Sequence, residues 1–140
     1  MKKILIVNSN YYKSISKKLV LSSKKKLNNK FKINIINVPG IYEIPIAIRK
    51  NIKIFDGFVA LGCVIKGQTP HFDLICNSTF YSILNLSITF NKPIGNGIIT
   101  AYNLKQALQR CNSTIIKKSD KGSEAANAVI SILQNGPKKI

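Results

Sequence analysis

The residues that could carry chemistry gather in one short segment, residues 62–73. A glycine turn at 67–69 leads into Thr69-Pro70, a pattern that predicts a helix with Thr69 as N-cap and Pro70 at its first position. His71, the single histidine of the chain, then falls in the first helical turn. Backbone N–H groups lack partners there and the helix dipole is positive. Such a turn can bind a phosphate, and an uncharged imidazole beside it can transfer protons.

Strand and helix signals alternate along the chain and must position this segment. Short β-branched or apolar runs predict strands, and longer runs with 3.6-residue spacing predict helices. The predicted strands are 3–7, 32–38, 56–65 and 94–100, and the predicted helices are 14–29, 41–51, 70–91, 103–111 and 120–134. This order predicts one α/β domain over residues 1–140, with a central four-stranded parallel sheet and helices on both faces.

Ligands of parallel sheets bind beyond the carboxyl ends of the strands. The unusual residues of this chain follow or lie in the four predicted strands: Asn10-Tyr11-Tyr12, residues 39–43 with Tyr42 and Glu43, residues 66–71 with Gln68 and His71, and Asn96-Gly97. We therefore expect these segments to converge on one small-molecule site at one edge of the sheet.

The composition of the chain argues against several classes of function. The 140 residues carry a net charge of +17 and are 45% hydrophobic. The lysines are scattered in small clusters without interleaved aromatic residues, so we expect a solvated basic surface and no dedicated nucleic-acid binding. Three unpaired cysteines and one histidine favour neither a metal site nor disulfides, and indicate a reducing, cytoplasmic location. No segment is long and apolar enough to span a membrane.

Each candidate residue also has an ordinary explanation. His71 could be a surface histidine, and Glu43 a first-turn acid favoured by the helix dipole. Arg110 could be a cation at a helix C-terminus, and Lys121 one lysine among many. The tyrosines near the strand ends could be boundary aromatics or could stack on a flat heterocycle. From spacing alone, the sequence predicts an α/β protein with an anion site and nothing more specific.

Three segments resemble the lumazine synthase family, in order along nearly the whole chain. They are residues 38–45 (VPGIYEIP), 60–73 (ALGCVIKGQTPHFD) and 121–126 (KGSEAA). The resemblance implies a three-layer, flavodoxin-like fold and a condensation that needs no cofactor or metal. In this family 5-amino-6-(D-ribitylamino)uracil and 3,4-dihydroxy-2-butanone 4-phosphate form 6,7-dimethyl-8-ribityllumazine, the penultimate step of riboflavin biosynthesis.

The resemblance also implies a role for each site residue. His71 matches the proton-transfer histidine, and Gln68 and Thr69, with Arg110, match the residues that bind the phosphate. The other matched positions surround the second substrate: Ile41, Tyr42 and Glu43 along the ribityl chain, Cys63, Val64 and Ile65 at the pyrimidine edge through backbone groups, and Tyr11, Asn96 and Lys121 around the ring. At position 11 this chain has a tyrosine where the family usually has a phenylalanine, and Asn96 replaces an aromatic residue that many members have.

Family sites lie between adjacent subunits, so Asn96, Arg110 and Lys121 are expected to come from the neighbouring chain. A long loop at 113–120 and the absence of an N-terminal extension favour a pentamer, or two stacked pentamers, over a sixty-subunit shell. Two other hypotheses stay open at this point. One is a flavin- or lumazine-binding protein without catalysis, and the other is a basic nucleic-acid-binding module.

Overall fold

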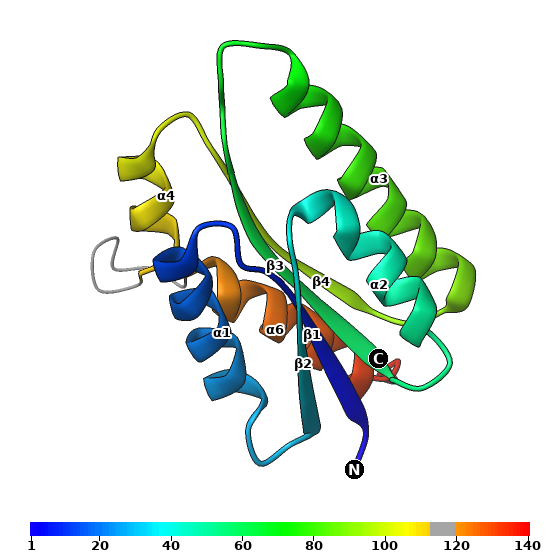
Figure 1. Ribbon diagram of the computed structural model, residues 1–140. Coiled ribbons are helices and arrows are strands. Elements are labelled where there is room, and N and C mark those ends of the chain that lie inside the picture. The colour runs from blue at the N-terminus through cyan, green and yellow to red at the C-terminus, as the bar shows by residue number, and fades with distance from the viewer. Residues whose placement is uncertain (113–119) are drawn as a thin grey trace.

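The computed structural model describes residues 1–112 and 120–140, which form a parallel sheet between two layers of helices (Figure 1). The sheet has four strands in the order β2-β1-β3-β4. The strands are β1 (Lys3–Ser9), β2 (Lys32–Val38), β3 (Gly57–Ile65) and β4 (Ile94–Ala101). The described helices are α1 (Lys13–Leu27), the 3₁₀ turn η1 (Ile41–Glu43), α2 (Ile44–Asn51), α3 (His71–Phe90), α4 (Leu104–Arg110) and α6 (Lys121–Gln134).

The two faces of the sheet bury separate hydrophobic cores. Along β1, Ile4 and Ile6 point to the face covered by α1 and α6, whereas Leu5 and Val7 point to the face covered by α2 and α3. Successive side chains of a strand alternate between faces, so a strand covered on both sides must be apolar throughout. This explains the unbroken apolar runs of β1 and β3, the two central strands.

The predicted four-stranded parallel sheet with helices on both faces is therefore confirmed. Strand β2 has the predicted bounds, and the other elements begin and end within one or two residues of the predicted ones. One helix differs in kind, because residues 41–51 begin with a 3₁₀ turn before α2. Residues 113–119, most of the loop predicted to be long, lie outside the described residues.

Glycines allow α6 to lie very close to β4. A Cβ on Gly95 would stand 2.8 Å from the carbonyl carbon of Ala125, and closer still to its oxygen. A Cβ on Gly97 would stand 2.5 Å from the side chain of Leu61 and 3.1 Å from that of Ala125. The backbone of α6 therefore occupies space that any larger residue on β4 would need, which fixes the position of this helix against the sheet.

Strand β2 is the open edge of the sheet opposite β4. Its side chains are exposed or half-buried at every position, and Lys32, Asn34 and Asn37 are among the exposed ones. The neighbouring β1 is buried from Ile4 to Ser9. Only one edge of β2 pairs with another strand of the described chain.

Candidate functional site

The turn where α3 begins follows the carboxyl end of β3. Pro70, with φ −69° and ψ 0°, takes the N-cap position, and its carbonyl accepts a 3.2 Å hydrogen bond from the N–H of Leu74. The prediction of Thr69 as N-cap is therefore wrong, and His71 rather than Pro70 is the first helical residue. The first hydrogen bond of the helix is accepted by the Pro70 carbonyl, so the helix begins one residue later than the capping pattern predicts.

The start of α3 leaves backbone N–H groups without hydrogen-bond acceptors. The first hydrogen bond of the helix is donated by Leu74, so the N–H groups of residues 71–73 have no partner from the preceding turn. Gln68, Thr69 and His71 are all exposed. Among the described residues, no backbone carbonyl or side chain occupies these donors. His71 lines none of the main cavities of the described chain, so a single chain does not enclose it.

Next to this turn, β3 ends in a tightly packed segment. Cys63 is buried, and Val64 and Ile65 become half-buried as the strand leaves the core. A Cβ on Gly62 would stand 2.8 Å from Ile41 and 3.1 Å from Ser9, so only glycine lets η1 and the end of β1 approach β3. The hydroxyl of Ser9 is buried without a hydrogen-bond partner among the described residues. Ser9 is not among the site residues predicted from the sequence, where its signal is a short polar residue at the end of an apolar strand.

The segment after β2 presents its polar residues to a neighbouring cavity. Ile41 is buried, whereas the Tyr42 side chain is 64% exposed. Tyr42 and Glu43 line a cavity of about 400 Å³ with Ser78 and Thr79 of α3. Thr79 is buried, and its hydroxyl has no hydrogen-bond partner in the described chain. A ligand in this cavity would find this hydroxyl available for a hydrogen bond.

Two aromatic residues follow β1 at the same edge. Tyr11 is 73% exposed, and its ring meets that of Tyr12 edge-on at 5.0 Å between centroids. An exposed flat ring at this edge can stack on a heterocycle.

Arg110 lines a cavity beside the start of α3. With Phe72, Thr100 and Gln106 it lines a cavity of about 270 Å³ between the start of α3, the end of β4 and α4. A second cation stands nearby, because the ammonium of Lys66 lies 5.4 Å from the centre of the Tyr102 ring, which lines the same cavity. Lys66, in the loop after β3, was not singled out from the sequence.

Two predicted residues lie away from the strand-end loops. Asn96 is the third residue of β4 and pairs with Ala60 in the middle of the sheet, so its predicted place at the carboxyl edge is wrong. The strand continues for five residues beyond it. The Asn96 side-chain oxygen accepts a 3.0 Å hydrogen bond from the N–H of Ile98. Lys121 begins α6 and forms an exposed 3.6 Å ion pair with Glu124.

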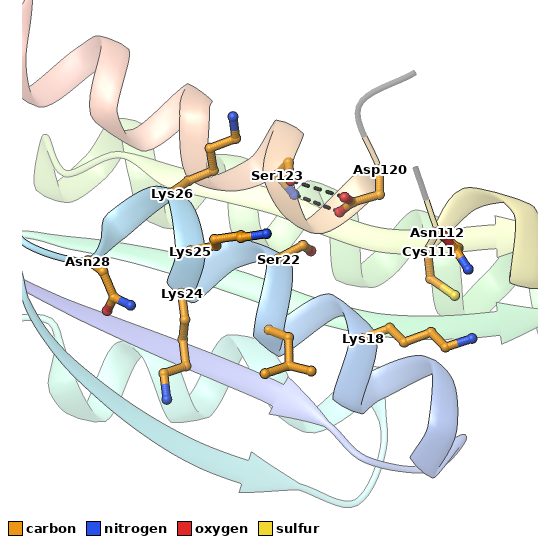
Figure 2. A pocket seen from close by; sticks show the side chains of 11 residues that line it. Lys18, Ser22, Lys24, Lys25, Lys26, Asn28, Cys111, Asn112, Asp120 and Ser123 are labelled. Atoms are coloured by element: carbon orange, nitrogen blue, oxygen red, sulfur yellow. Dashed lines mark hydrogen bonds between the residues drawn. The ribbon is translucent and has the colours of Figure 1, made fainter. Parts of the chain in front are cut away.

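The largest cavity of the described residues is not lined by any predicted site residue (Figure 2). It measures about 870 Å³ and lies between the lysines of α1 and the start of α6. Asp120 is its single carboxylate, and this group already accepts hydrogen bonds from the N–H and hydroxyl of Ser123 at 2.9 and 3.0 Å. The carboxylate thus caps α6, which is a structural role.

The three cysteines are free and buried. Burial, with a smaller contribution from the neighbouring Cys111, raises the pKa of the Cys63 thiol to about 11. A thiol that stays protonated at neutral pH is a poor nucleophile, so Cys63 can contribute to a site only through its backbone and its shape. Among residues 1–112 and 120–140, no cluster of histidine, cysteine and carboxylate side chains could hold a metal ion.

These features define a three-layer α/β protein with a four-stranded parallel sheet, a class in which ligands bind beyond the carboxyl ends of the strands. The sequence model of one family, described as 6,7-dimethyl-8-ribityllumazine synthase, matches residues 1–135. The chain belongs to this family.

Several relatives carry the same name. The 6,7-dimethyl-8-ribityllumazine synthase of Bartonella henselae is 39% identical over 135 residues, covering 93% of this chain and 85% of the relative. That of Novosphingobium aromaticivorans is 38% identical over 136 residues, covering 95% of each chain. That of Campylobacter jejuni subsp. doylei is 36% identical over 137 residues, covering 94% and 87%. The similarity therefore extends over the whole fold and all the strand-end loops.

Proposed function

We propose that this protein condenses 5-amino-6-(D-ribitylamino)uracil with 3,4-dihydroxy-2-butanone 4-phosphate, releasing phosphate, water and 6,7-dimethyl-8-ribityllumazine. Membership of the family over residues 1–135 is the observation that carries this proposal. The open N–H donors at the start of α3 support it, because one substrate is a phosphate ester and anions bind at helix N-termini.

The chemistry requires an amine, a carbonyl and proton transfers. The substrate amine attacks the ketone to form a Schiff base with loss of water, and phosphate is then eliminated. Enolisation follows, and ring closure with loss of a second water completes the product. His71, beside the phosphate turn, would move protons in these steps. Gln68 and Thr69 would bind the phosphate, and bringing the two substrates together would itself supply much of the rate acceleration.

The second substrate would lie along the neighbouring strand ends. Glu43, which lines a cavity with hydroxyl groups, would hydrogen-bond the ribityl chain beside Ile41 and Tyr42. The backbone of residues 63–65 would bind the pyrimidine edge, and the exposed ring of Tyr11 would stack on its face.

We further propose that the site is completed by a second copy of the chain in a pentamer or a pair of pentamers. His71 is exposed in the single chain and lines none of its main cavities, and Arg110 lines a small cavity beside the start of α3. Adjacent subunits would supply Arg110, Lys121 and Asn96 to this site. Helix α3 supports an assembly, because it exposes a stripe of large apolar side chains that water disfavours: Leu74, Tyr81, Leu84 and Ile88.

The subcellular location is also a proposal. Three free thiols fit a reducing compartment, so we place the protein in the cytoplasm. Among the described residues, none of the helices has the length and apolar run needed to cross a bilayer.

Lumazine fluorescence tests the reaction directly. The purified protein, mixed with both substrates, should produce the fluorescent product, and ligand binding without turnover would refute the enzymatic proposal. His71→Ala should lower kcat by at least about tenfold with little change in KM, because the imidazole acts on protons rather than on binding. An unchanged kcat would remove His71 from the chemistry.

Arg110→Ala should instead raise the KM for the phosphorylated ketone and leave the KM for the pyrimidine nearly unchanged. Arg49→Ala is the matched control, since Arg49 is the only other arginine and lies over the ring of Phe90, away from the site. Equal kinetics in the two variants would exclude Arg110 from the phosphate site.

Mass photometry tests the assembly. Five copies of a 15.5 kDa chain give about 78 kDa, and two pentamers give twice that mass. Tyr81→Asp, which adds a charge to the exposed stripe of α3, should shift the particles toward monomers. A megadalton particle, or a monomer in the unmodified protein, would contradict the proposed assembly.

A further inference from the structure

A second cavity, which we call the α1–β2 pocket, lies between α1 and the open edge strand β2. It has a volume of about 320 Å³. Its wall on the helix carries Lys13, Lys17 and Lys24. At 3.6 residues per turn, these three positions lie within about 40° of one line and span about 16 Å along the helix. Their long, flexible side chains allow the ammonium groups to converge on one ligand.

A chain of hydrogen bonds that runs from α1 through β1 to β2 also lines the α1–β2 pocket. The Ser16 hydroxyl donates to Oδ1 of Asn8 at 2.9 Å, and Nδ2 of Asn8 donates to Oδ1 of Asn37 at 3.0 Å. Ser16 and Asn8 are each only 4% exposed, so this arrangement is held inside the protein. It occupies the oxygen of the Asn37 side chain and leaves its amino group without a partner in the described chain, at the wall of the pocket.

The charged groups that line the α1–β2 pocket are therefore all cations, and the amino group of Asn37 adds a hydrogen-bond donor. The chain has five carboxylates, all within the described residues, and none of them lines this pocket: Glu43, Asp56, Asp73, Asp120 and Glu124. No lysine of α1 forms an ion pair in the described chain. Three positive charges that no acid neutralises, combined with an oriented amide, favour an oxyanion with several acceptor atoms.

We propose that the α1–β2 pocket binds a phosphate group, supplied as inorganic phosphate or as a small phosphomonoester. No aromatic residue lines the pocket, so it has no platform on which nucleic-acid bases could stack. The site is separate from the phosphate turn at residues 67–69, since the two share no lining residue and lie on different elements. It does not depend on the proposed reaction.

Asn37→Asp is the decisive variant. An aspartate keeps the oxygen that accepts from Asn8 and replaces the free amino group with a negatively charged oxygen. Asn34→Asp is the matched control, because Asn34 is an exposed residue of the same strand that does not line the pocket. Both variants add the same charge to β2, so nonspecific attraction of anions to a basic protein changes equally in both.

Binding of inorganic phosphate to the full chain should be measured by calorimetry and by ¹H–¹⁵N NMR, in an Arg110→Ala background that weakens the other proposed phosphate site. We expect saturable binding with shifts at residues 13–24 and 37, weakened at least tenfold by Asn37→Asp and unchanged by Asn34→Asp. A double Lys17→Ala, Lys24→Ala variant should weaken it similarly.

Three results would overturn the proposal. They are the absence of saturable phosphate binding in the Arg110→Ala background, equal binding by the two aspartate variants, and binding of duplex DNA with which phosphate does not compete. None of these results would bear on lumazine formation, which the fluorescence assay measures separately. Circular dichroism of each variant establishes that the fold is retained.

Discussion

Replacing Gly95 with alanine tests whether α6 is fixed by its contact with β4. The added Cβ would stand 2.8 Å from the carbonyl carbon of Ala125, whereas ordinary contact begins at 3.4 Å, so helix and strand must separate by at least 0.6 Å. Overfilling a packed interior costs about 1–3 kcal/mol, and a clash with backbone belongs at the upper end because it cannot rotate away. We expect the free energy of unfolding to fall by about 3 kcal/mol, which lowers Tm by roughly 6–12 °C for a chain of this size.

Urea denaturation followed by circular dichroism gives this free energy, with all variants at the same protein concentration because assembly also stabilises the fold. Gly67→Ala is the control, since a Cβ there meets no atom within 4 Å. This control should be neutral or stabilised by up to about 1 kcal/mol, because alanine lowers the entropy of the unfolded chain. If Gly95→Ala unfolds within about 1 kcal/mol of the unmodified protein, the close packing of α6 on β4 does not fix the helix.

Other predictions concern the thiol, the helix cap and one hydrogen bond between helices. Cys63 has a pKa of about 11 when folded and an ordinary value of 9.0, so the folded state retains its proton longer. The free energy of unfolding should therefore fall as pH rises from about 9 to 11, and Cys63→Ser should show a shallower decline in pH-dependent denaturation. Asp120→Ala should cost about 1–2 kcal/mol in urea denaturation, and Asp120→Asn clearly less, because the cap on Ser123 requires an oxygen. Ser23→Ala should cost about 1 kcal/mol by the same method, since it removes the 2.8 Å hydrogen bond from α1 to the Gly122 carbonyl in α6; no change would show that this bond adds nothing.

The sequence predicted the sheet well because its information is local. Alternating runs of β-branched residues and helical spacing mark the elements, and parallel pairing follows from their order. The start of α3 was misplaced by one residue because Pro70 can either begin a helix or precede it, and only the hydrogen-bond pattern of the folded chain decides. Asn96 is the third residue of both the predicted strand 94–100 and β4, so the strand was predicted correctly and the expectation of Asn96 at the carboxyl edge disregarded the strand residues that follow it.

The candidate site shows the same division between local and long-range information. The donors at the start of α3 follow from a local turn, so the sequence could predict them. The position of Lys66 over Tyr102 depends on how the ends of β3 and β4 meet, and the hydrogen bonds from Ser16 through Asn8 to Asn37 join three separate elements. Such contacts depend on tertiary packing, which a single sequence does not reveal.

The open edge of β2 has a consequence for solubility. An unpaired strand edge can recruit a strand from another molecule and begin a fibril. Here Lys32 and the polar Asn34 and Asn37 interrupt the isoleucines of the strand, and charges or strongly hydrated groups at an edge oppose such pairing. The polar residues of β2 therefore act as gatekeepers against aggregation, and replacing them with apolar residues would expose a template for amyloid-like growth.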